Sequence, residues 1–313
     1  MLFESLFCVY SFCKPVSPST MKLLTCVLLF LAMQACNTRA TIERIDLYSH
    51  AMDRELPVAV VLPQSYLKGQ IYYPVIYLLH GATGNHTDWL ERPVRKGLIQ
   101  QLADGYDIIF VLPEGEAYSF YLDSPWNEDS QFETFIAREV VSYIDERYRT
   151  VADPSARAIT GLSMGGHGAL YLSARNPGVF GLAGSMSGAV DLDMDSWELP
   201  AESRENFMRQ VAAEVGPEHL HPVFMADHSV VNMVSLMKEN QMPLIIDCGV
   251  DDFLIEANRK LNRRLLEAGV PHDYIERPGR HDWAYWTNAL LYQVLFMSEA
   301  FEWNSKKTRQ PPS

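Results

Sequence analysis

The sequence has little cysteine in the region that must fold. Of its five cysteines, Cys8, Cys13, Cys26 and Cys36 lie within the first 36 residues, which leaves Cys248 alone in the rest of the chain. A single cysteine cannot form a disulfide framework, so a fold held together by disulfides is excluded. Cys248 follows an apolar, strand-like run, and we expect it to be a buried core residue.

Positive charge is also scarce. The chain has 26 Lys and Arg against 39 Asp and Glu, which gives a formal net charge of −13. A nucleic-acid-binding domain would carry a basic stripe, and a protein that docks on anionic lipid would carry a basic cluster. The composition therefore argues against both classes of partner and favours a soluble enzyme that acts on neutral ligands.

The apolar run nearest the N-terminus is too short to span a bilayer as a helix. It covers residues 23–33 and directly follows Met21 and Lys22. A charged start followed by a short apolar core is typical of a secretory signal. We therefore expect residues 1–36 to be a leader and signal peptide, in which a start at Met21 would leave residues 1–20 untranslated.

The end of this signal permits more than one kind of processing. Met33-Gln34-Ala35-Cys36 resembles a bacterial lipoprotein box, in which the cysteine becomes the lipidated N-terminus, although its first two positions depart from the usual pattern. Cleavage after Ala35 or Ala40 without lipidation is the alternative, and a misread internal apolar segment is a third. We expect an exported protein, either anchored at the cell envelope through Cys36 or secreted or periplasmic.

Apolar and β-branched runs predict eight strands, and helical periodicity fills several of the gaps between them. The predicted strands cover residues 42–48, 58–62, 75–80, 108–112, 158–161, 182–185, 244–248 and 274–276; the clearest helices cover 132–148, 165–175, 230–239, 255–268 and 283–302. This alternation predicts an α/β fold, a mostly parallel eight-stranded sheet with helices on both faces. We expect residues 37–313 to form a single domain with a cap insertion at about 187–242 and a frayed tail from residue 306.

The most informative segment is Gly161-Leu162-Ser163-Met164-Gly165, at the end of the fifth predicted strand. A tight glycine turn is the simpler explanation, but the order strand, turn, helix favours a nucleophile elbow, in which the glycines leave room for crossing backbones. The serine would sit at a helix N-terminus, where unpaired N–H groups stabilise developing negative charge. The segment therefore predicts acyl chemistry with Ser163 as nucleophile.

A serine nucleophile needs a histidine to take its proton and an acid to orient that histidine. His281 lies in a glycine-containing loop after the last predicted strand and is the candidate base. Asp251 and Asp252 follow the strand at 244–248, and either could orient His281 or cap the next helix. The chain order Ser, Asp, His is that of α/β-hydrolases and differs from the two common protease orders.

The glycine-rich turn His80-Gly81-Ala82-Thr83-Gly84 follows the third predicted strand, where a second oxyanion donor is expected. We predict the backbone N–H groups of Ala82 and Met164 as the two donors. His80 and His167 also lie near this centre, but each is flanked by glycine in a tight turn, and we expect both to brace loops. The other histidines show no metal-ligand spacing.

Together these motifs resemble those of the esterase D-like α/β-hydrolases, a group of feruloyl, acetyl-xylan and tributyrin-type esterases, S-formylglutathione hydrolases and mycolyltransferases. The resemblance spans about residues 42–302, and its carriers are YLLHGATGN, LDSPWNEDSQFETFIAREVVSYIDERY, GLSMGGHGAL, CGVDDFL and GRHDWAYW. It implies an α/β-hydrolase fold with Ser163 as nucleophile, His281 as base and Asp252 as the orienting acid. It also implies oxyanion donors at Ala82 and Met164.

The function we expect is an exported serine carboxylesterase that works through an acyl-enzyme, with feruloyl or acetyl esters on plant polysaccharides as candidate substrates. Its partner is then a small-molecule or glycan-linked ester. An acyltransferase of the mycolyltransferase type, an S-formylglutathione hydrolase-like thioesterase and a non-catalytic binding protein on the same fold are the alternatives. The chemistry requires no cofactor, and the sequence does not indicate an oligomeric state.

Two further groups of residues have competing interpretations. Trp126, Trp197 and Trp283 are candidate substrate-binding residues, since aromatic walls suit a hydroxycinnamoyl group or a sugar face, but the same rings could be ordinary core. The acidic triplet at residues 191, 193 and 195 lacks the glycine and distal glutamate of a calcium loop. We therefore predict solvated surface there and no metal site.

Overall fold

The computed structural model describes residues 41–217 and 221–308. The predicted leader at residues 1–36, with Cys36, lies outside the described residues. Cys248 is a free, buried thiol, as predicted. No helix within the described ranges is long and apolar enough to cross a membrane.

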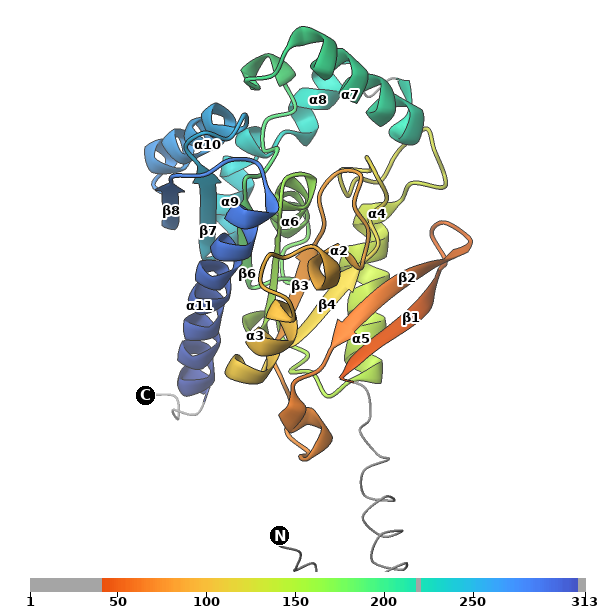
Figure 1. Cartoon of the computed structure of the whole chain (residues 1–313), viewed down its shortest axis with the longest axis vertical. Helices are drawn as coiled ribbons and strands as arrows, with labels where there is room; N and C mark the ends of the chain where they lie inside the picture. Colours follow the sequence, from red (N-terminus) through yellow and green to blue (C-terminus); the bar gives the residue numbers. More distant parts are fainter. Residues whose placement is uncertain (1–40, 218–220, 309–313) are drawn as a thin grey trace, which may run out of the picture. The chain divides into compact units, whose positions relative to one another are not determined.

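Eight strands form one sheet in the order β1-β2-β4-β3-β5-β6-β7-β8 (Figure 1). β2 pairs antiparallel with both β1 and β4, whereas the strands from β4 to β8 run parallel. All eight predicted strands are present, and the predicted mostly parallel sheet is confirmed. The strands are β1 Ile42–Ser49, β2 Arg54–Val61, β3 Val75–Leu79, β4 Ile109–Pro113, β5 Arg157–Gly161, β6 Leu182–Met186, β7 Leu244–Gly249 and β8 His272–Arg277.

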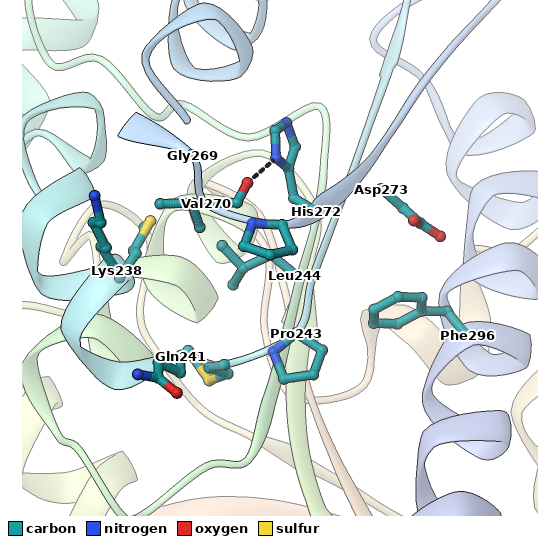
Figure 2. Close-up of a pocket in the computed structure, with 12 residues that line it drawn as sticks. Lys238, Gln241, Pro243, Leu244, Gly269, Val270, His272, Asp273 and Phe296 are labelled. Carbon is teal, nitrogen blue, oxygen red and sulfur yellow. Dashed lines mark hydrogen bonds between the residues drawn. The ribbon is translucent and has the colours of Figure 1, made fainter. Parts of the chain in front are cut away.

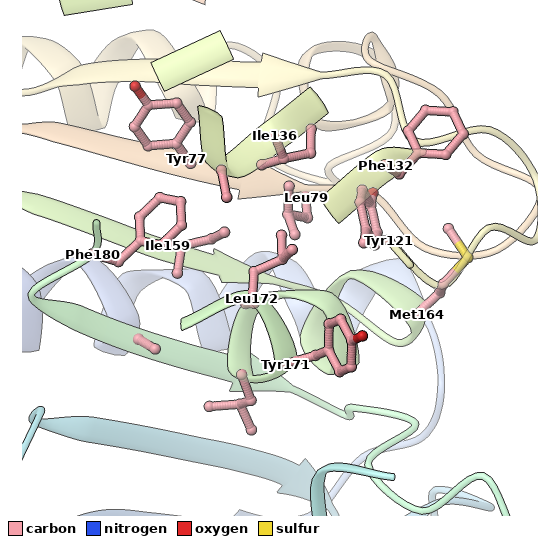
Figure 3. Close-up of a cluster of buried hydrophobic side chains, with 14 of the residues drawn as sticks. Tyr77, Leu79, Tyr121, Phe132, Ile136, Ile159, Met164, Tyr171, Leu172 and Phe180 are labelled. Atoms are coloured by element: carbon pink, nitrogen blue, oxygen red, sulfur yellow. The ribbon is translucent and has the colours of Figure 1, made fainter. Parts of the chain in front are cut away.

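Helices cover both faces of this sheet because successive side chains of a buried strand point to opposite sides. In β3, Tyr77 and Leu79 join one apolar cluster, in which they lie near Leu172 of α6 (Figure 3). This cluster also includes side chains of α5, α9 and α10, whereas Ile76 and Leu78 join a second cluster with α3 and α11. The helices are α2 Asp88–Glu91, α3 Leu98–Tyr106, α4 Phe132–Thr134, α5 Val141–Arg147, α6 Met164–Arg175, α7 Ala201–Val215, α8 Pro222–His228, α9 Val234–Asn240, α10 Ile255–Ala268 and α11 Trp283–Thr308. A π-helical segment at Phe135–Val140 joins α4 to α5, and short 3-10 turns lie at Gln64–Leu67, Pro154–Ala156, Met194–Ser196 and Val230–Asn232.

The predicted helices are present; the one predicted at 255–268 has the predicted bounds, and the others have shifted ends. The helix predicted at 132–148 is the continuous run α4, π-helical segment and α5, and the one predicted at 230–239 is a 3-10 turn followed by α9. The prediction of a frayed tail from residue 306 is wrong for residues 306–308, because α11 continues to Thr308. α3 was not predicted, although its buried residues Leu98, Ile99, Leu102 and Ala103 have helical spacing.

The segment between β6 and β7 forms a cap that is smaller than predicted. α7 and α8 lie beyond the carboxyl ends of the central strands (Figure 1). α9, by contrast, packs against α6 and α10 and buries Val234 and Met237 in the main core. α9 therefore belongs to the helix layer, and the predicted cap at 187–242 reduces to the part of the chain that carries α7 and α8.

Candidate active site

Ser163 lies at the sharp turn between β5 and α6. Its backbone has φ 55° and ψ −118°, a conformation that L-residues rarely adopt. A Cβ on Gly165 would lie 2.5 Å from the carbonyl oxygen of His80 and 2.7 Å from that of Leu79, and a Cβ on Gly161 would lie 2.6 Å from the Gly165 backbone. These close approaches explain why glycines flank the serine two residues away on each side.

The imidazole of His281 joins Ser163 to Asp252. Its Nε2 atom is 2.9 Å from Oγ of Ser163, and its Nδ1 atom is 2.8 Å from Oδ2 and 3.0 Å from Oδ1 of Asp252. A carboxylate only accepts, so Nδ1 donates to Asp252 and Nε2 is left to accept from the serine hydroxyl. The structure thus brings Ser163, His281 and Asp252 into the hydrogen-bonded contact that a nucleophile, a base and an orienting acid require.

The structure distinguishes the two adjacent aspartates. Asp251 is exposed, whereas the side chain of Asp252 is buried against His281. Asp252 also accepts the N–H of Leu254 through Oδ1 at 2.9 Å, just before α10 begins. Asp252 is therefore the aspartate positioned to orient His281, and its carboxylate also fixes the turn before α10, whose N-cap Leu254 has no side-chain cap.

Two backbone N–H groups lie beside the nucleophile. Met164 is the first residue of α6, so its N–H has no acceptor within the helix. Ala82 follows Gly81, which approaches so closely that a Cβ there would lie 3.3 Å from Cβ of Ser163. In the described parts of the chain the Ala82 N–H donates to no other backbone group. Their positions make the N–H groups of Ala82 and Met164 candidates for binding an oxyanion.

Comparison with known proteins decides the family. A family model for esterases matches residues 49–297, most of the chain. The chain belongs to this esterase family. The resemblance to esterase D-like enzymes is thereby confirmed, and the protein is a carboxylic ester hydrolase.

Individual relatives of this esterase agree with that assignment. The acetyl esterase of Caldicellulosiruptor saccharolyticus is 29% identical over 281 residues, which cover 85% of this chain and 98% of that protein. A solved ferulic acid esterase has a TM-score of 0.70 and 29% identity, covering 83% of this chain and 98% of its own. The Staphylococcus aureus serine hydrolase FphF shares the fold, with a TM-score of 0.69 at 21% identity over 82% of this chain and 98% of its own. The predicted α/β-hydrolase fold is therefore confirmed.

The esterase places a row of aromatic rings between His281 and the cap. Phe253 packs on the imidazole at a centroid distance of 4.4 Å, and Trp286 meets it edge-on at 4.8 Å. Trp197 contacts Phe253 at 5.9 Å and Phe207 of α7 at 5.4 Å. The contacts form a continuous aromatic wall of Phe253, Trp197 and Phe207 from the imidazole to the cap helix.

The three predicted tryptophans have different positions relative to this wall. Trp197 is part of it, although its ring is buried. Trp283 packs at a centroid distance of 5.5 Å against Trp286, the ring that contacts His281. Trp126 is 43% exposed and packs at 5.1 Å against Phe224 of α8, on the cap. Sequence reasoning missed Phe253 and Phe207; the position of Phe253 directly after Asp252 is the signal that could have found it.

The remaining polar residues near the site have structural partners. His167 is buried with Nδ1 3.2 Å from the carbonyl oxygen of Phe120 and Nε2 2.9 Å from that of His228, and burial lowers its pKa to about 4. Asp191 pairs with Lys260 at 2.5 Å, and Asp193 accepts the N–H of its own 3-10 turn. Among the described residues, no group of three or more His, Cys, Asp or Glu could hold a metal ion.

A cavity of about 540 Å³ lies away from this constellation (Figure 2). It is lined by Leu244 and His272 at the amino ends of β7 and β8, and by Lys238, Gln241 and Phe296. Ser163 and Asp252 follow the carboxyl ends of β5 and β7, at the opposite edge of the sheet, where open α/β sheets bind their ligands. This cavity is therefore not part of the esterase site.

Proposed function

We propose that this esterase is a serine carboxylesterase that uses Ser163, His281 and Asp252 and proceeds through an acyl-enzyme. The observation that carries the proposal is the continuous path of 2.9 Å from Ser163 to His281 and 2.8 Å from His281 to Asp252. His281 takes the proton of Ser163 Oγ as that oxygen attacks the ester carbonyl, and Asp252 stabilises the resulting imidazolium.

The later steps follow from the same groups. The N–H groups of Ala82 and Met164 donate to the oxyanion of the tetrahedral intermediate. The alcohol leaves with the proton that His281 took, and an acyl group stays on Ser163. Water then attacks this acyl-enzyme with His281 again as base, which releases the acid and restores the serine.

We propose acetyl or feruloyl esters of plant polysaccharides as the substrates. Relatives named acetyl esterase and ferulic acid esterase support these two acyl groups. The aromatic wall suits a phenolic ring or a sugar face. A small apolar pocket of about 20 Å³ lies under the cap between Phe120 and Leu192; such a volume holds roughly one methyl- or water-sized group. We propose that the acyl group enters this pocket, and a pocket of this size would accept acetyl more readily than longer acyl chains.

Two hydrogen bonds connect the surroundings of the pocket to Ser163 and to α6, one between backbone groups and one from the side chain of His167. Ala189 donates to the carbonyl oxygen of Ser163 at 3.1 Å, three residues before Leu192. The carbonyl of Phe120 lies 3.2 Å from the imidazole of His167, one turn of α6 beyond Ser163. Both walls of the pocket are thus attached to residues that adjoin the reaction centre.

The decisive experiment compares wild type with Ser163→Ala on p-nitrophenyl acetate, p-nitrophenyl butyrate and methyl ferulate. We expect the variant to lose turnover by about 10⁴-fold or more, while Ser142→Ala, on the exposed surface of α5, stays near wild type. The order of the three esters ranks acetyl against phenolic substrates. No turnover of any ester by wild type would sink the proposal.

Two alternative activities can be separated in the same assays. Addition of a sugar or alcohol acceptor shows whether the acyl-enzyme is partitioned to a new ester, as in a transferase, or to free acid. S-formylglutathione as substrate tests the thioesterase. Hydrolysis of oxygen esters that exceeds both activities supports the carboxylesterase.

We also propose that the enzyme is exported, with residues 1–36 as its leader and Cys36 as the lipid-modified residue. The apolar run at 23–33 and the Ala35-Cys36 pair support this assignment. Expression of the full chain and of Cys36→Ser in a bacterial host, followed by detergent phase partition, tests it. We expect the full chain in the detergent phase and Cys36→Ser in the aqueous phase; wild type in the aqueous phase would contradict lipidation.

A further inference from the structure

The Ala82 N–H belongs to a peptide plane whose other end is held by hydrogen bonds. The peptide unit is planar and trans, so this N–H points away from the carbonyl oxygen of Gly81. That oxygen lies 2.8 Å from Nδ1 of His80 and accepts the N–H of Gly84 at 3.1 Å. Because the plane is rigid, any group that holds the oxygen also sets the direction of the Ala82 N–H.

The protonation of the His80 ring follows from its second contact. The backbone N–H of Gly115 donates to Nε2 of His80 at 2.9 Å, so Nε2 carries no hydrogen and Nδ1 must carry the ring proton. Oε1 of Glu114 lies 3.3 Å from the same Nε2 and would be the acceptor if Nε2 carried the hydrogen. That hydrogen would, however, face the hydrogen of the Gly115 N–H, so this arrangement is excluded. The His80 side chain is 1% exposed, so water does not compete for either nitrogen.

Residues 114–116, which hold His80 through Gly115, are themselves fixed by hydrogen bonds. The carboxylate of Glu114 accepts the N–H of Glu116 at 3.0 Å and Nδ1 of His86 at 2.9 Å. The carboxylate also accepts the backbone N–H of His86 at 3.3 Å, and such hydrogen bonds favour its charged form. The carboxylate is therefore ionised and binds its donors strongly. From another side, the hydroxyl of Tyr121 donates to the carbonyl oxygen of His80 at 2.9 Å.

We propose that His80 is the positioning residue of the oxyanion hole. Its Nδ1–H holds the Gly81 carbonyl and thereby aims the Ala82 N–H at the oxyanion, while His80 itself touches neither substrate nor Ser163 Oγ. The inference rests on the proposed function, in which Ala82 is an oxyanion donor. It assigns His80 a role in transition-state stabilisation that goes beyond bracing a loop.

The test uses His80→Leu, which removes the ring nitrogens, and His80→Asn, which keeps an N–H donor near the position of Nδ1. His272 supplies matched controls, since its Nδ1 also lies 2.8 Å from a nearby backbone carbonyl, that of Val270, but in the remote cavity (Figure 2). For each variant, kcat and KM are measured on p-nitrophenyl acetate in the full-length enzyme. Two further measurements are the inhibition constant of a boronic acid, which forms a tetrahedral adduct with Ser163, and the unfolding temperature.

We expect His80→Leu to lower kcat about 10- to 100-fold and to raise the inhibition constant of the boronic acid by a similar factor, with KM changed less than about twofold. This loss is smaller than the 10²- to 10³-fold decrease in kcat that follows removal of an oxyanion donor, because a misaimed N–H retains some interaction with the oxyanion. His80→Asn should recover much of both losses, and His272→Leu and His272→Asn should change neither quantity.

Two results would overturn the inference. One is unchanged boronic acid affinity in His80→Leu; the other is a loss of kcat that His80→Asn does not recover. If His80→Leu does not fold, His80→Gln takes its place, because its amide N–H reaches the position of Nε2 and not that of Nδ1; we expect the same losses of kcat and boronic acid affinity, and unchanged values refute the role of His80. If turnover requires Ser163 but not His80, only this inference is wrong. If turnover does not require Ser163, the proposed function is wrong.

Discussion

Replacement of Asp252 by Asn is expected to leave the site assembled and nearly inactive. Oδ1 of Asp252 accepts the Leu254 N–H at 2.9 Å, so an amide at this position must keep its oxygen there. Its NH₂ group then occupies the place of Oδ2, 2.8 Å from Nδ1 of His281. A donor at that point forces the imidazole to accept through Nδ1 and to carry its proton on Nε2, the atom that faces Ser163.

The size of the effect follows from the loss of the base. With a hydrogen on Nε2, His281 cannot take the serine proton, and the reaction must proceed through the rare correct tautomer. The same change in a serine protease of known mechanism lowers kcat about 10⁴-fold, and we expect a similar loss here. Because Asn fills the same volume and keeps the bond to Leu254, the unfolding temperature should fall by no more than a few degrees.

The assay is steady-state hydrolysis of p-nitrophenyl acetate, with Asp251→Asn as the matched control. Asp251 is adjacent in sequence but exposed, so its variant should keep kcat within about twofold. Loss of activity in Asp251→Asn equal to that in Asp252→Asn, or a loss under tenfold in Asp252→Asn, would show that the carboxylate of Asp252 does not set the tautomer of His281.

Three further predictions concern packing, pH and the aromatic wall. Gly165→Ala forces a Cβ to 2.5 Å from the His80 carbonyl, and we expect urea unfolding to show a loss of about 2–3 kcal/mol, whereas Gly105→Ala, which faces open space, should not destabilise. Burial and the charge of Glu116 raise the pKa of Glu214 to about 7; the native state then binds the extra proton, so stability should fall from about pH 4.5 to 7 by roughly 1–2 kcal/mol after allowance for partial exposure. Glu214→Gln should remove that part of the slope, and an unchanged slope would contradict it. Phe207→Ala should raise KM for methyl ferulate about fivefold or more and for p-nitrophenyl acetate much less; equal changes would place Phe207 outside the substrate site.

The sheet and the turn that carries Ser163 could be predicted because their signals are local. Strands buried on both faces appear as continuous apolar runs, and the glycines around Ser163 are required by contacts of 2.5–2.7 Å that no other residue permits. α3 was missed since it is short and has Gly97 at its N-cap and Gly105 within it, which conceals the spacing of its buried residues. The size of the cap was overestimated because α7 and α9 both lie between β6 and β7 in the sequence. Only the packing of α9 against α6 and α10 shows that it belongs to the helix layer.

The residues around the triad depend on contacts between distant parts of the chain. Phe207 lies on a largely polar helix, α7, in which Val211 and Val215 are the residues buried, so nothing local marks it as part of the site. The bracing role of His80 could be predicted from its position, but its tautomer depends on the N–H of Gly115, from the loop after β4. Sequence reasoning therefore found the candidate triad more readily than the side chains packed around it.

The structure also links the cap to residues 80–84, the loop that carries the proposed oxyanion donor Ala82 (the oxyanion loop), through one short segment. Gly115 holds His80, and the carbonyl of Ala117 accepts the N–H of Thr83 at 2.8 Å. In the same segment, the N–H of Tyr118 donates to Glu214 of α7 at 2.8 Å. A cap variant that only removes a ring should therefore change KM, whereas Glu214→Ala, which releases Tyr118, should also lower kcat by displacing the residues that hold the oxyanion loop. Glu214→Gln keeps an acceptor for Tyr118 and should preserve kcat; if both variants lose kcat equally, the coupling does not pass through this hydrogen bond.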